Sequence, residues 1–171
     1  MGPGLLSYIG RLELVAFFTG YPIVFLAVQI IGEITTRKWA VGLKSTARLL
    51  PFGYALVGTL YLGLVLRNLY PNYFPLHFTD QLEQNLLKLW GLSAILFWIP
   101  AVSRKKIISF FHSLFFIYLL VEDFLWQSHA GTTNDVLRND MHMYTVSILL
   151  NTGAFAAIAI LHFVVSRIRI H

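Results

Sequence analysis

The sequence predicts an all-α integral membrane protein, a bundle of about five transmembrane helices with its N-terminus outside and its C-terminus in the cytoplasm. Three observations support this prediction: an apolar composition, five apolar stretches and an uneven distribution of basic residues. Of the 171 residues, 57% are apolar and only 12% are charged, and the mean hydropathy is +0.67. One soluble core of this size cannot hold so much apolar surface, so the lipid bilayer must act as the solvent.

The five apolar stretches lie at about residues 12–34, 50–67, 85–100, 107–126 and 142–165. Four of them approach the roughly 20 residues that a helix needs to cross about 30 Å of hydrocarbon. The third stretch is short and contains Lys88, so a re-entrant or interfacial segment is the alternative there. Because no repeat or linker interrupts residues 1–171, we expect a single transmembrane helical domain.

The distribution of basic residues favours five crossings over four. With five crossings, nine of the thirteen Lys and Arg residues share the cytoplasmic side, as the positive-inside rule requires. These nine are Arg37, Lys38, Lys44, Arg48, Arg104, Lys105, Lys106, Arg167 and Arg169. If the third stretch did not cross, the cluster at residues 104–106 would move outside and the two sides would nearly balance. We expect a plasma or inner membrane location on this basis.

Two local patterns predict how the helices pack. Pro22 follows Gly20 and Tyr21 in the first stretch, and because proline lacks a backbone donor we expect a kink near Phe18. Small residues recur at a spacing of four in the second and fifth stretches, which allows close approach of two backbones. They are Ala55, Thr59 and Gly63 in the second stretch and Gly153 and Ala157 in the fifth. We therefore expect the second and fifth helices near the centre of the bundle.

Ionisable residues at membrane depth are the first candidates for function, because placing them in lipid is costly. Glu122 and Asp123 end the fourth stretch, but neighbouring side chains on a helix point about 100° apart and do not face each other. Asp123 shares a helix face with His112 and is a candidate cation or proton site, with a solvated helix end as the alternative. Glu33 lies one turn from Arg37, and we interpret this pair as an interfacial ion pair.

The fifth stretch carries a polar and small face that the sequence predicts to line the bundle interior. Its members are Tyr144, Ser147, Asn151, Ala154, Ile158 and His162. Asn151 lies near mid-membrane, where it either bonds another helix or contacts a ligand. His162 lies as far above the basic residues of its stretch as His112 does in the fourth. Two opposed histidines at one depth are what axial ligation of a b-type haem requires.

Several chemistries are excluded by residues that the sequence lacks. There is no cysteine, which excludes disulfides, thiolate metal sites and cysteine nucleophiles. The metalloprotease, P-loop, serine hydrolase and dinucleotide-binding motifs are also missing. The net charge of +5 comes mainly from the topology-determining clusters, so we expect no nucleic-acid partner.

The sequence favours a non-enzymatic bundle that binds or moves a small molecule or ion, or serves as a subunit of a membrane complex. Its ligand-binding residues would be Asp123, Asn151, His112, His162 and Glu122. We expect no cofactor, and as partners the lipid bilayer and other membrane subunits or further copies of the chain. The alternative is a haem b electron-transfer protein using His112 and His162. A second alternative is an intramembrane enzyme that modifies a lipid or isoprenoid, with Glu122 or Asp123 as the acid.

Overall fold

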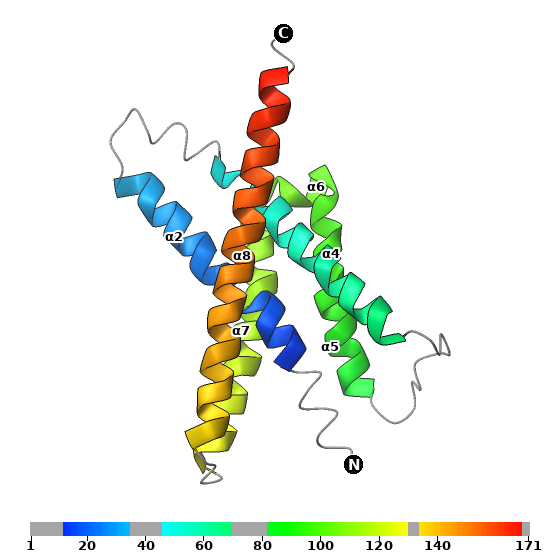
Figure 1. The fold of residues 1–171 in the computed structure, drawn as a ribbon, viewed down its shortest axis with the longest axis vertical. Coiled ribbons are helices and arrows are strands. Elements are labelled where there is room, and N and C mark those ends of the chain that lie inside the picture. Colours follow the sequence, from blue (N-terminus) through cyan, green and yellow to red (C-terminus); the bar gives the residue numbers. More distant parts are fainter. Residues whose placement is uncertain (1–11, 35–45, 70–81, 130–133, 169–171) are drawn as a thin grey trace.

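The computed structural model describes residues 12–34, 46–69, 82–129 and 134–168, which are helical almost throughout (Figure 1). The elements are α2 (Tyr21–Ile34), α4 (Leu50–Leu69), α5 (Leu82–Leu92), the 3₁₀ helix η1 (Ser93–Trp98), α6 (Pro100–Ser103), α7 (Lys106–His129) and α8 (Asn134–Ile168). A further helical segment at residues 12–18 precedes α2. No strand occurs in the described ranges, which confirms the all-α prediction.

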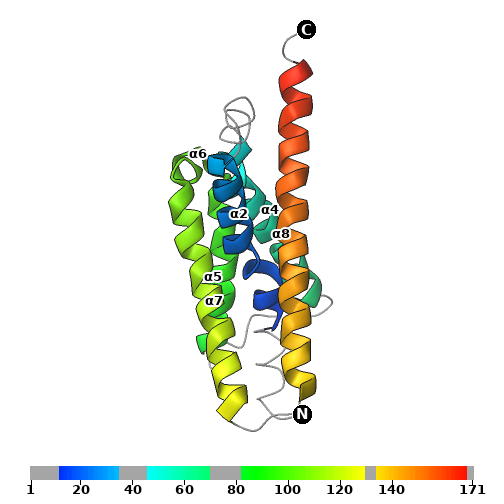
Figure 2. The same ribbon diagram turned by 90° about the vertical axis from the view of Figure 1, so that its left-hand side faces the viewer.

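Successive helical runs alternate in direction along the long axis of the bundle (Figure 1). Seen from the side, α5 and α7 lie on one side, α2 and α4 occupy the middle, and α8 lies on the other side (Figure 2). The end of α2, the start of α4 and the α6–α7 junction meet at one end of the bundle. We call this the basic end, because it holds Arg48, Arg104, Lys105 and Lys106.

Three helices are long and apolar enough to cross a membrane: Leu12–Ile34, Leu50–Asn68 and Met141–Ile168. In the described part of the chain, Asn85–Trp98 is a shorter apolar helix and α7 is not among the three. Large apolar side chains are exposed on the outside of the bundle, including Leu26, Phe111 and Leu149. Exposed apolar side chains are favourable in contact with lipid and unfavourable in contact with water, so the fold is compatible with a membrane protein.

The first helix breaks where the sequence predicts a kink. Residues 12–18 are helical, Thr19 and Gly20 form a turn, and α2 starts at Tyr21. Pro22 thus falls in the first turn of α2, where its missing N–H leaves no helical bond unmade. The Thr19 hydroxyl donates back to the carbonyl of Val15 at 2.6 Å, a contact that bends helices.

Two polar side chains of α8 hold this break in place. The backbone N–H of Gly20 donates to Oγ of Ser147 at 2.8 Å, and Nδ2 of Asn151 donates to the carbonyl of Phe17 at 2.8 Å. Ser147 and Asn151 lie one turn apart on α8 and are both buried. One side chain therefore accepts from the broken helix and the other donates to it, which fixes where the two helices cross.

An aromatic cluster with rings from α4 and α7 packs against the break. Phe18 is stacked on Phe116 with ring centroids 4.7 Å apart. Tyr54 and Tyr61 contact the Phe18 ring edge-on, with centroid distances of 5.7 and 5.3 Å. All four side chains have no exposed surface. These packed rings join the first helix to α4 and α7, and buried aromatic pairs of this geometry add to the stability gained from area alone.

The predicted place of the fifth helix is wrong. The buried share of its apolar window is 17%, against 56% for the first helix and 44% for the second, so α8 lies at the periphery. Gly153 has open space around it and Ala157 is exposed. The close approaches use other glycines instead: Gly20 meets α8, Gly53 meets Phe155 of α8, and Gly58 meets Ala94 of η1. Spacing of small residues identified α4 and α8 as closely packed helices, and Ala55 is buried, but Gly63, Gly153 and Ala157 do not lie at the close contacts.

Two predicted boundaries also change. The third stretch is α5 followed by a 3₁₀ helix, and α6 starts after an extended residue, Ile99. The fifth helix starts at Asn134, eight residues before the predicted position 142, because hydropathy marks the apolar part of a helix and not its end.

We expect Gly20→Ala to destabilise the bundle by about 1–3 kcal/mol, because the new Cβ would overlap the backbone of Ser147 and Ile148 and push α8 away. Gly153→Ala is the matched control, since a Cβ there meets nothing within 4 Å. Thermal unfolding of both variants in detergent measures the difference. Equal melting temperatures for the two variants would contradict this account of the contact.

Candidate functional site

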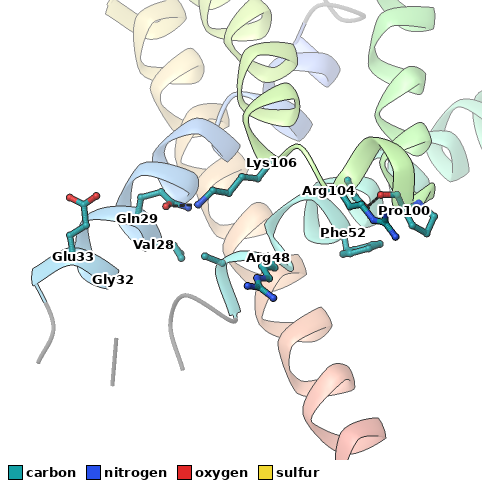
Figure 3. Close-up of a pocket in the computed structure, with 11 residues that line it drawn as sticks. Val28, Gln29, Gly32, Glu33, Arg48, Phe52, Pro100, Arg104 and Lys106 are labelled. Carbon is teal, nitrogen blue, oxygen red and sulfur yellow. Dashed lines mark hydrogen bonds between the residues drawn. The ribbon is translucent and has the colours of Figure 1, made fainter. Parts of the chain in front are cut away.

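A cavity of about 720 Å³ lies at the basic end between α2, α4, α6 and α7 (Figure 3). This volume lies in the range of small-molecule sites, about 300–1,000 Å³. Its lining residues are Val28, Gln29, Gly32, Glu33, Ala47, Arg48, Phe52, Pro100, Ser103, Arg104 and Lys106. We call it the basic cavity, because its lining contains three cationic side chains and one carboxylate.

The cations reach the basic cavity from three separate segments. Arg48 precedes α4, Arg104 follows α6, and Lys106 is the first residue of α7. Nζ of Lys106 donates to Oε1 of Gln29 at 2.8 Å, and Figure 3 shows these two side chains pointing toward each other from α7 and α2. Glu33 stands at one edge of the group.

Neither arginine of the basic cavity is neutralised by a carboxylate in the described part of the structure, where no ion pair to Arg48 or Arg104 is found. Nε2 of Gln29 is buried and also lacks a hydrogen-bond partner there. Buried donors of this kind normally have acceptors, so a group with free donors beside two cations is suited to an anion.

Sequence reasoning did not identify this site. It assigned Arg48, Arg104 and Lys106 to membrane topology, and it paired Glu33 with Arg37, which lies outside the described residues. A signal was present, because the residues that start or end several apolar stretches on one side of a membrane must lie at one depth. The sequence did not show that Arg48, Arg104 and Lys106 line the same cavity.

His112, a predicted ligand, is fully engaged inside the bundle. Its Nδ1 lies 2.7 Å from the Tyr54 hydroxyl, and its Nε2 lies 2.7 Å from Oγ of Ser93 and 3.1 Å from the carbonyl of Trp90. A carbonyl only accepts, so the network assigns the proton to Nε2 and makes Nδ1 the acceptor for Tyr54. The ring also stacks on Trp90 at 4.7 Å. His112 thereby joins α7 to α4, α5 and η1.

His162, the other predicted iron ligand, lies in a different environment. Residues 160–165 of α8 are all exposed, and α8 extends past the other helices at this end (Figures 1 and 2). The prediction assumed that equal distance from the basic residues means facing positions, but none of the described helices stands opposite this part of α8 (Figure 2). The structure does not bring the two histidines together. The haem interpretation stays a prediction, and it requires His112 to release one of its hydrogen bonds.

Asn151 acts as an interhelical contact, one of its two predicted roles. Besides the bond to Phe17, its Nδ2 donates to the carbonyl of Ser147 at 2.8 Å. Its Oδ1 is buried without a partner among the described residues. The polar face of α8 is buried at Ser147, Asn151, Ala154 and Ile158.

The predicted carboxylates lie at the other end of α7. Glu122 lines a recess of about 540 Å³ between α5 and α7, whose walls are mainly apolar and include Trp90 and Phe115. His112 lines an adjoining recess of about 510 Å³ that shares Trp90. The side chain of Asp123 lies outside the described part of the structure. The lipid-modifying alternative therefore stays untested.

Comparison of the chain with protein-family models, curated proteins and solved structures finds no match.

We expect His112→Phe to lower the free energy of unfolding by about 1–3 kcal/mol, because it keeps the ring but leaves the buried Tyr54 hydroxyl without a partner. Chemical unfolding in detergent measures this change. The double variant with Tyr54→Phe should recover part of the loss, since it removes the orphaned hydroxyl. His162→Phe is the control, and an equal loss there would contradict a structural role specific to His112.

Proposed function

We propose that this chain is a non-enzymatic membrane protein that binds a small anionic molecule in the basic cavity. The observation that carries the proposal is the convergence of Arg48, Arg104 and Lys106 on one recess of about 720 Å³. Their charges exceed the single carboxylate of Glu33, so the cavity attracts anions. Arginine also presents a planar fork of donors that fits carboxylates and phosphates.

The proposal includes the finer topology, with five crossings, the N-terminus outside and the basic end in the cytoplasm of a plasma or inner membrane. The alternating direction of the helical runs supports it (Figure 1). The Asn85–Trp98 segment is short for a crossing, but the first turn of α5 extends the same run back to Leu82. A 3₁₀ helix also rises about 2.0 Å per residue against 1.5 Å for an α-helix, so η1 spans more depth than its length indicates.

The natural absence of cysteine makes the topology directly testable. We expect a single cysteine at Asn68→Cys, at the far end of α4, to react with a membrane-impermeant maleimide on intact cells. Ala101→Cys, exposed on α6, should react only after the membrane is opened. Labelling of Ala101→Cys on intact cells would show that the third segment does not cross.

Anion binding predicts a saturable rise in melting temperature for protein in a nonionic detergent. The two probes are inorganic phosphate, at constant ionic strength against chloride, and dodecyl phosphate added to the micelle. A bound ligand at ten times its Kd adds about 1.4 kcal/mol to the stability. Arg48→Gln with Arg104→Gln should abolish the rise, and Arg167→Gln, which removes a charge from α8 outside the cavity, should keep it. If neither probe stabilises the native chain, the proposed function is wrong.

A further inference from the structure

We infer that the ligand of the basic cavity is a membrane lipid with a phosphate headgroup, and that the phosphate lies among Arg48, Arg104 and Lys106. This inference rests on the proposed function, because it names the class of anion that the same cavity takes. Three features of the described residues lead to a lipid instead of a soluble anion: the depth of the cavity, its mixed lining and the chemistry of its donors.

The cavity lies at the depth where lipid headgroups lie. Glu33 is in the last turn of α2, Arg48 comes just before α4, and Lys106 begins α7. Each of these residues therefore marks the point where an apolar helix leaves the hydrocarbon. Basic pockets between membrane helices at this level are suited to anionic headgroups.

The lining is amphipathic, as the ligand must be. Beside the cations stand Val28, Ala47 and Phe52, which offer apolar wall to a glycerol backbone or the start of an acyl chain. Next to the cavity along α2 and α7, Ile30 and Ile107 are exposed on the outer surface. An acyl chain that leaves the cavity on this side enters the lipid directly, so its apolar surface is not exposed to water.

The donors of the cavity are of the kinds that bind phosphate. The guanidinium groups of Arg48 and Arg104 are fixed forks for bidentate bonds, and Lys106 is held by Oε1 of Gln29. That bond orients the amide of Gln29, whose Nε2 is buried without a hydrogen-bond partner among the described residues. Three cations and the Glu33 carboxylate leave a net charge of +2, which matches the charge of about −1.5 to −2 on a phosphate monoester.

Charge-preserving variants test the inference in bilayers. The protein is placed in phosphatidylcholine nanodiscs that contain a minor fraction of phosphatidic acid, and native mass spectrometry counts the lipids retained per chain. We expect Arg48→Lys with Arg104→Lys to bind phosphatidic acid about tenfold more weakly, because lysine keeps the charge but loses the fork. These variants also keep the positive charges that set topology. Arg167→Lys on α8 is the matched control and should bind as the native chain does.

Each of the other outcomes contradicts the inferred lipid site, and one of them also contradicts the proposed function. Equal retention by the native chain and the Lys variants would show general attraction to an anionic surface, and the inferred lipid site would be wrong. Soluble glycerol phosphate that competes as well as the lipid would show a free-anion site, so the inference would fail and the proposed function would stand. If neither phosphatidic acid nor glycerol phosphate binds, both fail.

Discussion

The break of the first helix at Thr19 and Gly20, and its attachment to α8, determines most of the remaining architecture. The break exposes backbone groups inside the bundle, where an unmet donor or acceptor is costly because no water reaches it. Ser147 accepts from Gly20 and Asn151 donates to Phe17, both at 2.8 Å. Ser147 and Asn151 lie on successive turns of α8, and both must face the break for these bonds to form. The two bonds therefore fix the point where α8 crosses the first helix.

The direction of α2 follows from that break, and the basic cavity follows from the direction of α2. Beyond Tyr21 the helix runs obliquely to α8, so that its last turns line the cavity opposite α6 and the start of α7. The Lys106–Gln29 bond spans the space between α7 and α2. In the proposed function the basic residues there have two roles. Their charge orients the chain across the membrane, and their position around one recess lets them bind an anion.

His112 shows how the sequence can identify a residue whose contacts only the tertiary structure supplies. A histidine at membrane depth is costly, so the sequence was right to single it out. Its cost is offset by the bonds to Tyr54, Ser93 and Trp90, which come from two other parts of the chain. The change from α5 to η1 begins at Ser93, whose Oγ also donates to the Trp90 carbonyl at 2.6 Å. A single sequence contains no information on which distant side chains will meet a given ring nitrogen.

The sequence by itself determined the helical class, the approximate apolar segments and the kink near Phe18, because these depend on hydropathy and on proline, which act locally along the chain. It also placed Asn151 correctly as a polar side chain that needs a partner on another helix. Only the tertiary structure decided which faces pack, since Gly20, Gly53 and Gly58 take the close contacts that were expected at Gly153. It alone placed His162 on an exposed part of α8, and it alone gathered Arg48, Arg104 and Lys106 around one cavity. The physical reason is that lipid gives helices no hydrophobic preference for one another, so their rotation and crossing are set by contacts between residues far apart in the chain.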